Sequence, residues 1–268
     1  STITWKTMFD DFVDTTWVNN TFEEFMANRS VISQRLQEEN PASAGIYFNP
    51  SDTAFNDNFA EGYGPVSQDV LIPAFLAAYK GRDAERVRLN PLQTIPLPNW
   101  RITYNGLAKF PWARKVFSNL SITHGYQSTM TVNSFQTNLD YEGPDAYTEP
   151  QAIDSLNGNF YSQFTIPDLV INEQLSPLIG VDATFRNGLT LRFDYRKSRT
   201  MALNFSDFQM IETRSTQITA GLGYRVKGLK LPFKVKGKKV ILHNDLNMRF
   251  DFSLRDNVTV NHLLDQGI

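Results

Sequence analysis

The sequence predicts a mainly β fold built from long antiparallel strands, preceded by an irregular, partly helical N-terminal region. From about Asn99 onward, apolar and polar residues alternate with a period of two over stretches of fifteen or more residues. Residues 1–90 show no such period. The longest apolar run, residues 70–79, is broken by Pro73 and is shorter than the roughly twenty residues that a transmembrane helix needs.

Composition narrows the class of protein. The chain of 268 residues is 41% hydrophobic and 13% aromatic, which argues against disorder of the whole. It has no cysteine, so disulfides, thiolate metal sites and cysteine catalysis are excluded. With 26 basic and 28 acidic residues it shows no global charge that would indicate nucleic acid, and we expect no nucleic-acid partner. The charge is uneven, because residues 1–90 carry 13 acidic and 7 basic residues whereas residues 91–268 carry 15 and 19.

The N-terminal part, residues 1–98, is expected to be an acidic, irregular and partly helical insertion. Helical spacing of apolar residues predicts two helices, over residues 21–40 and 67–81. Thr21 and Glu24 suggest a capping box for the first of them. Between the helices, residues 50–65 are rich in Gly, Asn, Asp and aromatics and are expected to form an ordered loop.

The remainder, residues 99–268, is expected to form an antiparallel wall. In residues 189–205 the odd positions are mainly apolar and the even positions mainly polar, and only a strand alternates its faces in this way. The same pattern predicts further long strands over residues 116–133, 208–226 and 240–255, and shorter ones over residues 100–104 and 178–185. Asn187-Gly188 is a strong hairpin signal between two of them.

Two interpretations fit this alternation. A soluble antiparallel sheet packs its apolar face inward, whereas a membrane β-barrel turns its apolar face to lipid and its polar face to a watery lumen. Three features favour the membrane β-barrel: the length of the strands, the aromatic residues near the strand ends, and the charges of both signs on the polar face. About six strands weigh against a complete barrel, because barrels of this type have at least eight.

The membrane interpretation assigns two sets of residues. The expected lumen-lining set is Arg192, Asp194, Arg196, Arg249, Asp251 and Arg255. The expected lipid-facing set is Leu191, Phe193, Leu222, Tyr224, Phe250 and Phe252.

No catalytic, metal-binding or cofactor-binding motif is recognisable. His124, His243 and His262 are isolated in the sequence, and His124 falls on the apolar face of its strand, where a packed residue is expected. Six lysines lie within residues 227–239. They fit either a solvated loop or a contact with lipid phosphates or an acidic partner. We expect no enzyme activity and no cofactor.

Several long strings resemble the SprA/Sov family. They are GYGPVSQDVLIPAFLAAY (residues 62–79), IPLPNWRITYNGL (95–107), SITHGYQSTMTVNSF (121–135), SPLIGVDATFRNGLTLRFDYRKSR (176–199), TQITAGLGYRVKG (216–228) and LNMRFDFSLRDNVTVNHLLDQ (246–266). The resemblance runs nearly end to end. This family is the outer-membrane translocon of the type 9 secretion system, which is coupled to gliding motility in some bacteria.

The resemblance implies a fold and a function. The chain would be a C-terminal-side fragment forming an arc of a very large transmembrane β-barrel in the bacterial cell outer membrane. Its partners would be the remainder of the SprA-like barrel, a PorV-type barrel protein, a plug protein, outer-membrane lipid and secreted cargo with a C-terminal signal. Residues 1–98 would lie in the lumen or at its rim. Residues 105–115 and 227–239 would be periplasmic turns, and residues 141–159 an external loop.

One alternative from another class remains open. The chain could be a soluble or surface-attached β-rich binding module with a helical cap, and the two hypotheses differ in whether the folded protein depends on detergent. A hydrolase would need a site that the sequence does not display.

Overall fold

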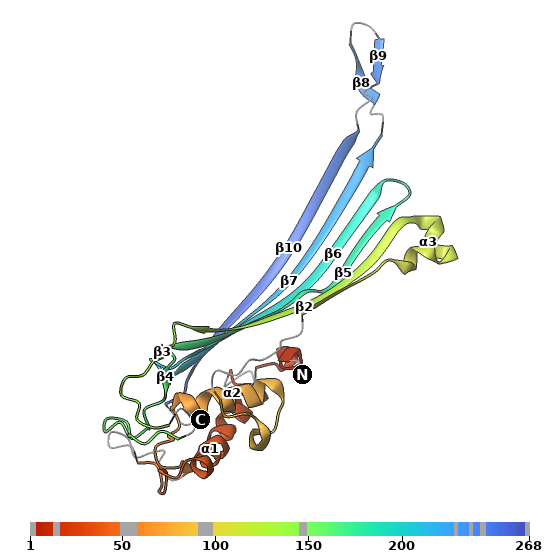
Figure 1. The fold of residues 1–268 in the computed structure, drawn as a ribbon. Helices are drawn as coiled ribbons and strands as arrows, with labels where there is room; N and C mark the ends of the chain where they lie inside the picture. Colours follow the sequence, from red (N-terminus) through yellow and green to blue (C-terminus); the bar gives the residue numbers. More distant parts are fainter. Residues whose placement is uncertain are drawn as a thin grey trace.

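The computed structural model describes residues 4–12, 17–48, 58–90, 99–144, 149–227, 230–235, 238–241 and 245–265. Figure 1 shows one long, curved sheet with a layer of helices at one end and a small hairpin projecting from the other. The protein is mainly β, as the sequence predicts.

Six strands form the large sheet, and every neighbouring pair is antiparallel. In spatial order they are β1 (Trp100–Tyr104), β2 (Phe117–Asn133), β5 (Asp168–Phe185), β6 (Leu189–Asn204), β7 (Gln209–Val226) and β10 (Leu246–Leu263). Among the described residues β1 and β10 are the edges, so this part of the chain is an open sheet and not a closed barrel.

Two small sheets flank the large one. β3 (Gln136–Thr137) pairs with β4 (Phe164–Thr165) within the long β2–β5 connection. β8 (Lys230–Val235) pairs with β9 (Lys238–Ile241) in the hairpin that extends beyond β7 and β10. The lysine-rich segment, predicted as a loop or contact segment, therefore contains two short strands.

The predicted long strands are present, and two boundaries differ. β5 has 18 residues, whereas the sequence predicts a strand only over residues 178–185. The pattern fails there because Glu173 occupies an apolar-face position and a register shift lies between Leu175 and Ile179. The predicted strand over residues 240–255 overlaps the end of β9 and the first part of β10, which continues to Leu263; residues 242–244 lie outside the described part.

Both predicted helices are present in the N-terminal layer. They are α1 (Asn20–Glu39) and α2 (Gln68–Lys80), accompanied by the 3₁₀ turns η1 (Thr4–Phe9) and η3 (Ala84–Arg86). The predicted capping box was wrong, because the side chain of Asn19 caps α1 by accepting a bond from the backbone N–H of Phe22 at 2.8 Å. α2 ends at Gly81, whose φ of 56° suits glycine. Of the predicted loop over residues 50–65, the described part begins at residue 58.

The main core lies between the helices and one end of the sheet. Every residue of α2 from Asp69 to Lys80 is buried. On the sheet side the core takes in apolar residues from β5, β6 and β7, namely Leu169, Ile171, Met201, Leu203 and Met210. Burial of each such side chain stabilises the fold by about 1.5–3 kcal/mol. The helical layer is therefore packed firmly onto the sheet.

Asp69 provides a pH test of this core. It is buried in the first turn of α2, accepts a hydrogen bond from the Ser162 hydroxyl, and burial raises its pKa from 3.8 to about 6. The folded state therefore binds the proton more tightly, and its free energy of unfolding falls as the pH rises from about 4 to 6. We expect Asp69→Asn to remove this fall and to be more stable than the wild type at pH 7, by on the order of 2 kcal/mol.

Urea unfolding at pH 4.5 and pH 7, followed by tryptophan fluorescence, measures the effect. Glu38→Gln, at an exposed position of α1, is the matched control. An unchanged pH dependence in Asp69→Asn would contradict the assignment.

Candidate functional site: the two faces of the sheet

One face of the sheet carries a continuous band of apolar residues. This band lies toward the end of the sheet from which the β8–β9 hairpin projects. The register places side chains of all six strands in one row across this band: Tyr104, Ile122, Val181, Phe193, Ala220 and Phe252. Rows on either side of it contain Leu191, Leu222 and Phe250 together, and Tyr195, Ile218 and Leu254 together. We call these rows, with the row of Leu189, Tyr224 and Met248 and the row of Val226 and Leu246, the apolar band.

The apolar band is exposed. Phe250 is 68% exposed, Leu254 60% and Leu222 48%, although Leu222 lies on β7, which has a neighbouring strand on each side. Along β10 the band runs from Leu246 to Leu254, about 27 Å of strand at roughly 3.4 Å per residue. At the tilt of about 40° found in membrane barrels this length gives a height of about 21 Å, close to the apolar belt of about 25 Å in such barrels.

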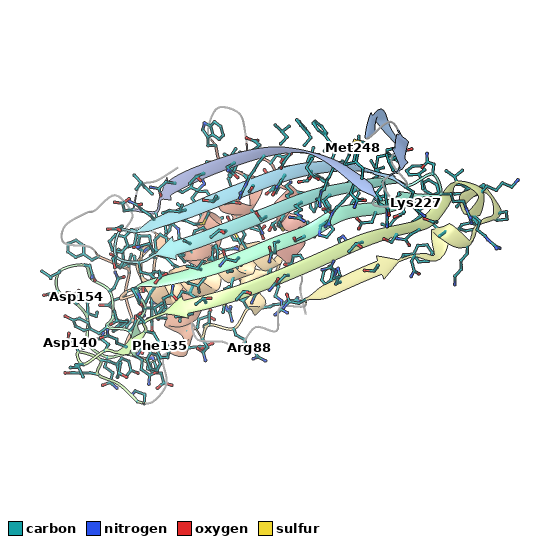
Figure 2. The ribbon with its side chains drawn as sticks, turned by 90° about the horizontal axis from the view of Figure 1, so that it is seen from above. Arg88, Phe135, Asp140, Asp154, Lys227 and Met248 are labelled. Atoms are coloured by element: carbon teal, nitrogen blue, oxygen red, sulfur yellow. The ribbon has the colours of Figure 1, made fainter. Side chains whose placement is uncertain are left out.

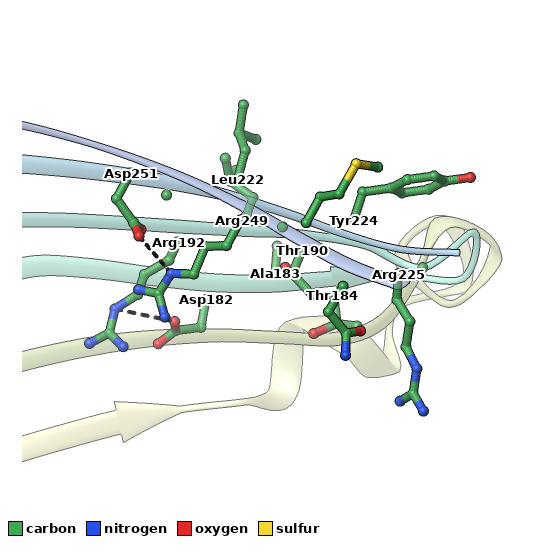
Figure 3. Close-up of a pocket in the computed structure, with 16 residues that line it drawn as sticks. Asp182, Ala183, Thr184, Thr190, Arg192, Leu222, Tyr224, Arg225, Arg249 and Asp251 are labelled. Carbon is green, nitrogen blue, oxygen red and sulfur yellow. Dashed lines mark ion pairs between the residues drawn. The ribbon is translucent and has the colours of Figure 1, made fainter. Parts of the chain in front are cut away.

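The opposite face is polar. The register confirms that Arg192, Asp194 and Arg196 of β6 share this face with Arg249, Asp251 and Arg255 of β10. Arg192 contacts both Asp194, at 3.0 Å, and Asp182 of β5, at 3.8 Å. Arg249 pairs with Asp251 at 2.7 Å, as Figure 3 shows. Four of these residues line part of a groove of about 440 Å³, namely Asp182, Arg192, Arg249 and Asp251.

Glycines make room for these charges between the strands. Gly221 of β7 lies directly between Arg192 and Asp251 in the register. A Cβ atom at Gly221 would approach Asp251 Oδ1 to 2.7 Å, and one at Gly223 would approach Thr190 Oγ1 to 2.3 Å. Glycines inside a strand pattern predict a close backbone approach or a bend, and at Gly221 and Gly223 side chains of the neighbouring strands approach the backbone. Because glycine has no side chain, the Asp251 carboxylate and the Thr190 hydroxyl can lie close to the backbone of β7.

A buried charge cluster marks the inner boundary of the apolar band. The next row along the face carries Lys197 and Asp256. Beyond it lie four buried charged residues, Glu173, Arg199, Glu212 and Arg214, which we call the charge cluster. Arg199 binds Glu173, Arg214 Nε lies 2.7 Å from Glu212 Oε1, and the Tyr126 hydroxyl donates to Glu173 at 2.7 Å.

The N-terminal segment covers this cluster. Arg199 donates to the Thr7 hydroxyl at 2.6 Å, and Arg214 donates to the backbone carbonyl of Asp10. The Lys197 ammonium lies 4.7 Å from the centre of the Phe9 ring, and the Arg214 guanidinium 4.2 Å from that of Phe12. These contacts give the buried cations hydrogen-bond acceptors and aromatic rings as partners. Burial of the same charges without partners would be costly.

This packing shows on which face of the sheet the N-terminal layer lies. Arg199 and Met201, against which the layer packs, occupy the same face of β6 as Phe193 of the proposed lipid-facing set. The layer therefore lies on the same side of the sheet as the apolar band. The expected position of residues 1–98 in the lumen or at its rim stays a prediction.

The sequence assigned the two faces but missed the charge cluster. Lys197 and Arg199 interrupt the apolar side of residues 189–205, and this interruption is the signal that could have indicated a covered zone. The partners Glu173 and Glu212 come from other strands, which a single-strand pattern does not relate. His124 is packed as predicted, with its Nδ1 atom 2.7 Å from the Leu178 carbonyl oxygen.

Within the described ranges, no group of three or more His, Asp or Glu side chains is placed to hold a metal ion. In that same part of the chain, no helix is both long and apolar enough to cross a membrane. Comparison with protein-family models and with curated proteins found no match.

The charge cluster predicts a large cost for losing one partner. Arg199→Met leaves Glu173 buried without its main counter-charge, so we expect the free energy of unfolding to fall by about 3–5 kcal/mol. Arg249→Gln, at the exposed ion pair with Asp251 on the polar face, should cost less than about 1 kcal/mol. Urea unfolding of both variants under the same conditions gives the comparison. Equal losses would show that the cluster has no special role.

Proposed function

We propose that this chain is part of the protein-conducting outer-membrane barrel of the type 9 secretion system, where it passes folded cargo across the outer membrane and supports gliding motility. The observation that carries the proposal is the exposed apolar band on one face of a sheet whose other face is lined with ion pairs. The resemblance of the sequence to the SprA/Sov family supplies the identity of the pore.

The two faces suit different surroundings. Large apolar side chains such as Phe250 and Phe252 are stabilised by contact with lipid, and charged residues at the same depth would cost about 2–4 kcal/mol. On the other face Arg192, Asp194 and Asp251 offer charges of both signs to a wet passage. Because neighbouring charges compensate one another, a folded cargo would meet no strongly attractive surface.

The open sheet edges require partners in this proposal. β10 has 18 residues, and β7 is its one neighbour in the described sheet. Its outer backbone groups could be satisfied in a bilayer only by a further strand. The remainder of a SprA-like barrel would supply this strand, and a PorV-type barrel protein and a plug protein would control the openings.

A second candidate is a soluble or surface-attached β-rich binding module. The N-terminal layer favours it, because α1 and α2 cover the apolar residues Leu203 and Met210 in the manner of a helical cap. This cap leaves the apolar band uncovered, which is why we place the candidate second.

Adjacent positions on β6 test the sidedness. Leu191→Asp puts a carboxylate in the apolar band, whereas Thr190→Asp puts the same group on the polar face. We expect Leu191→Asp to lower the stability of the membrane-inserted state by on the order of 2 kcal/mol, and Thr190→Asp to leave it nearly unchanged. The measurement is the fraction of protein that folds into lipid vesicles, and equal fractions in the two variants would refute the assignment of faces.

Fractionation of native cells decides between the two candidates. An antibody raised against residues 141–159 should detect the protein in the outer-membrane pellet, and the folded protein should require detergent. Detection in the soluble fraction, with a fold that is stable without detergent, would support the binding module instead.

A further inference from the structure

All three connections at the end of the sheet away from the helices are basic. They are residues 105–118 between β1 and β2, residues 185–189 between β5 and β6, and residues 225–246 between β7 and β10. Their described residues include one acidic residue, Asp245, and ten basic ones: Lys109, Arg114, Lys115, Arg186, Arg225, Lys227, Lys230, Lys234, Lys238 and Lys239. We call this the basic end.

The opposite end has the reverse charge. The connections over residues 134–167 and 204–209 contain six acidic residues and no basic one: Asp140, Glu142, Asp145, Glu149, Asp154 and Asp207. Figure 2 shows Asp140 and Asp154 at one end of the long sheet and Lys227 at the other. A solvated loop has no need for such a separation, which indicates that the two ends meet different surroundings.

The basic connections lie against one another. The Arg186 side chain donates from Nε to the backbone carbonyl of Arg114 at 2.7 Å, and the Arg186 backbone N–H donates to Val116. The backbone N–H of Arg225 donates to Gly188, which joins the β7 end to the same group. Asp245 is paired with Arg225, so the one acidic residue of these connections is already engaged.

Exposed aromatic residues stand among these charges. Between β1 and β2, the short helix α3 (Pro111–Val116) carries Trp112, which is 60% exposed, and its N-cap is Phe110, which is 47% exposed. The apolar band begins directly beyond them, at Tyr104 of β1 and Leu246 of β10. Trp beside basic residues at the margin of an apolar belt is the chemistry of a membrane–water interface.

We propose that the basic end binds the headgroups of anionic phospholipids in the leaflet that borders this side of the apolar band. This inference rests on the proposed membrane function and adds a lipid specificity and an orientation to it. Basic side chains on Lys109, Arg114 and Lys115 meet the phosphates, while Trp112 lies at the level of the glycerol groups.

Spin-labelled lipids test the proposal on the full chain reconstituted into phosphatidylcholine vesicles. The size of the motionally restricted lipid component is compared for spin-labelled phosphatidylglycerol and phosphatidylcholine. We expect the wild type to prefer phosphatidylglycerol by about fivefold, which corresponds to about 1 kcal/mol for a lipid that contacts one basic residue. The triple variant Lys109→Gln, Arg114→Gln, Lys115→Gln should lose most of this preference.

Charge-matched controls keep the test specific. Arg82→Gln, Arg86→Gln, Arg88→Gln removes three exposed basic residues from the N-terminal layer and should leave the preference intact. In the wild type, 1 M salt should abolish the preference, because charges are then screened within about 3 Å. This salt series keeps the proposal testable if the triple variant fails to fold.

The outcomes separate the two proposals. A missing restricted component for both lipids would overturn the membrane function itself. A restricted component with equal affinity for the two lipids, a preference that survives 1 M salt, or an equal loss in the control triple variant would overturn the lipid inference alone.

Discussion

The structure depends on a mismatch of length: the strands of the large sheet are longer than the helical layer that packs on them. β5, β7 and β10 each have 18 residues, and the helices cover only the part of the face around Leu169, Met201 and Met210. The alternation of side chains nevertheless continues to the far ends of the strands. The apolar residues of the uncovered part are therefore left exposed, and this exposure underlies both proposals.

The charge cluster separates the covered from the uncovered part of this face. Glu173 and Arg199 sit at positions where the alternation would place apolar residues, and their burial is tolerated because each contacts a partner and the segment around Thr7 covers them. One face of a single sheet thus serves two environments, and a row of paired charges lies between them.

Apolar–polar alternation over long stretches predicted most of the strands, whereas single charged residues within a strand hid parts of the fold. The strands β6 and β7 follow from the alternation of apolar and polar residues, although Lys197 and Arg199 interrupt the apolar side of β6. β5 was recognised only in part, because Glu173 breaks its pattern and finds its counter-charge on another strand. The assignment of residues to two faces followed from alternation, but the side on which the N-terminal layer packs depends on contacts between distant residues, which no local pattern encodes.

The N-terminal helical layer also restrains the sheet at one end. Arg29 of α1 donates to the backbone carbonyl of Leu264 at 2.9 Å, just after β10, while Gln68 of α2 accepts a bond from the backbone of Ile166, just before β5. The sheet is therefore clamped across several strands at its acidic end and unclamped at its basic end. A sheet held in this way resembles a cantilever, so its displacements are smallest beside the helices and largest at the end that carries the β8–β9 hairpin.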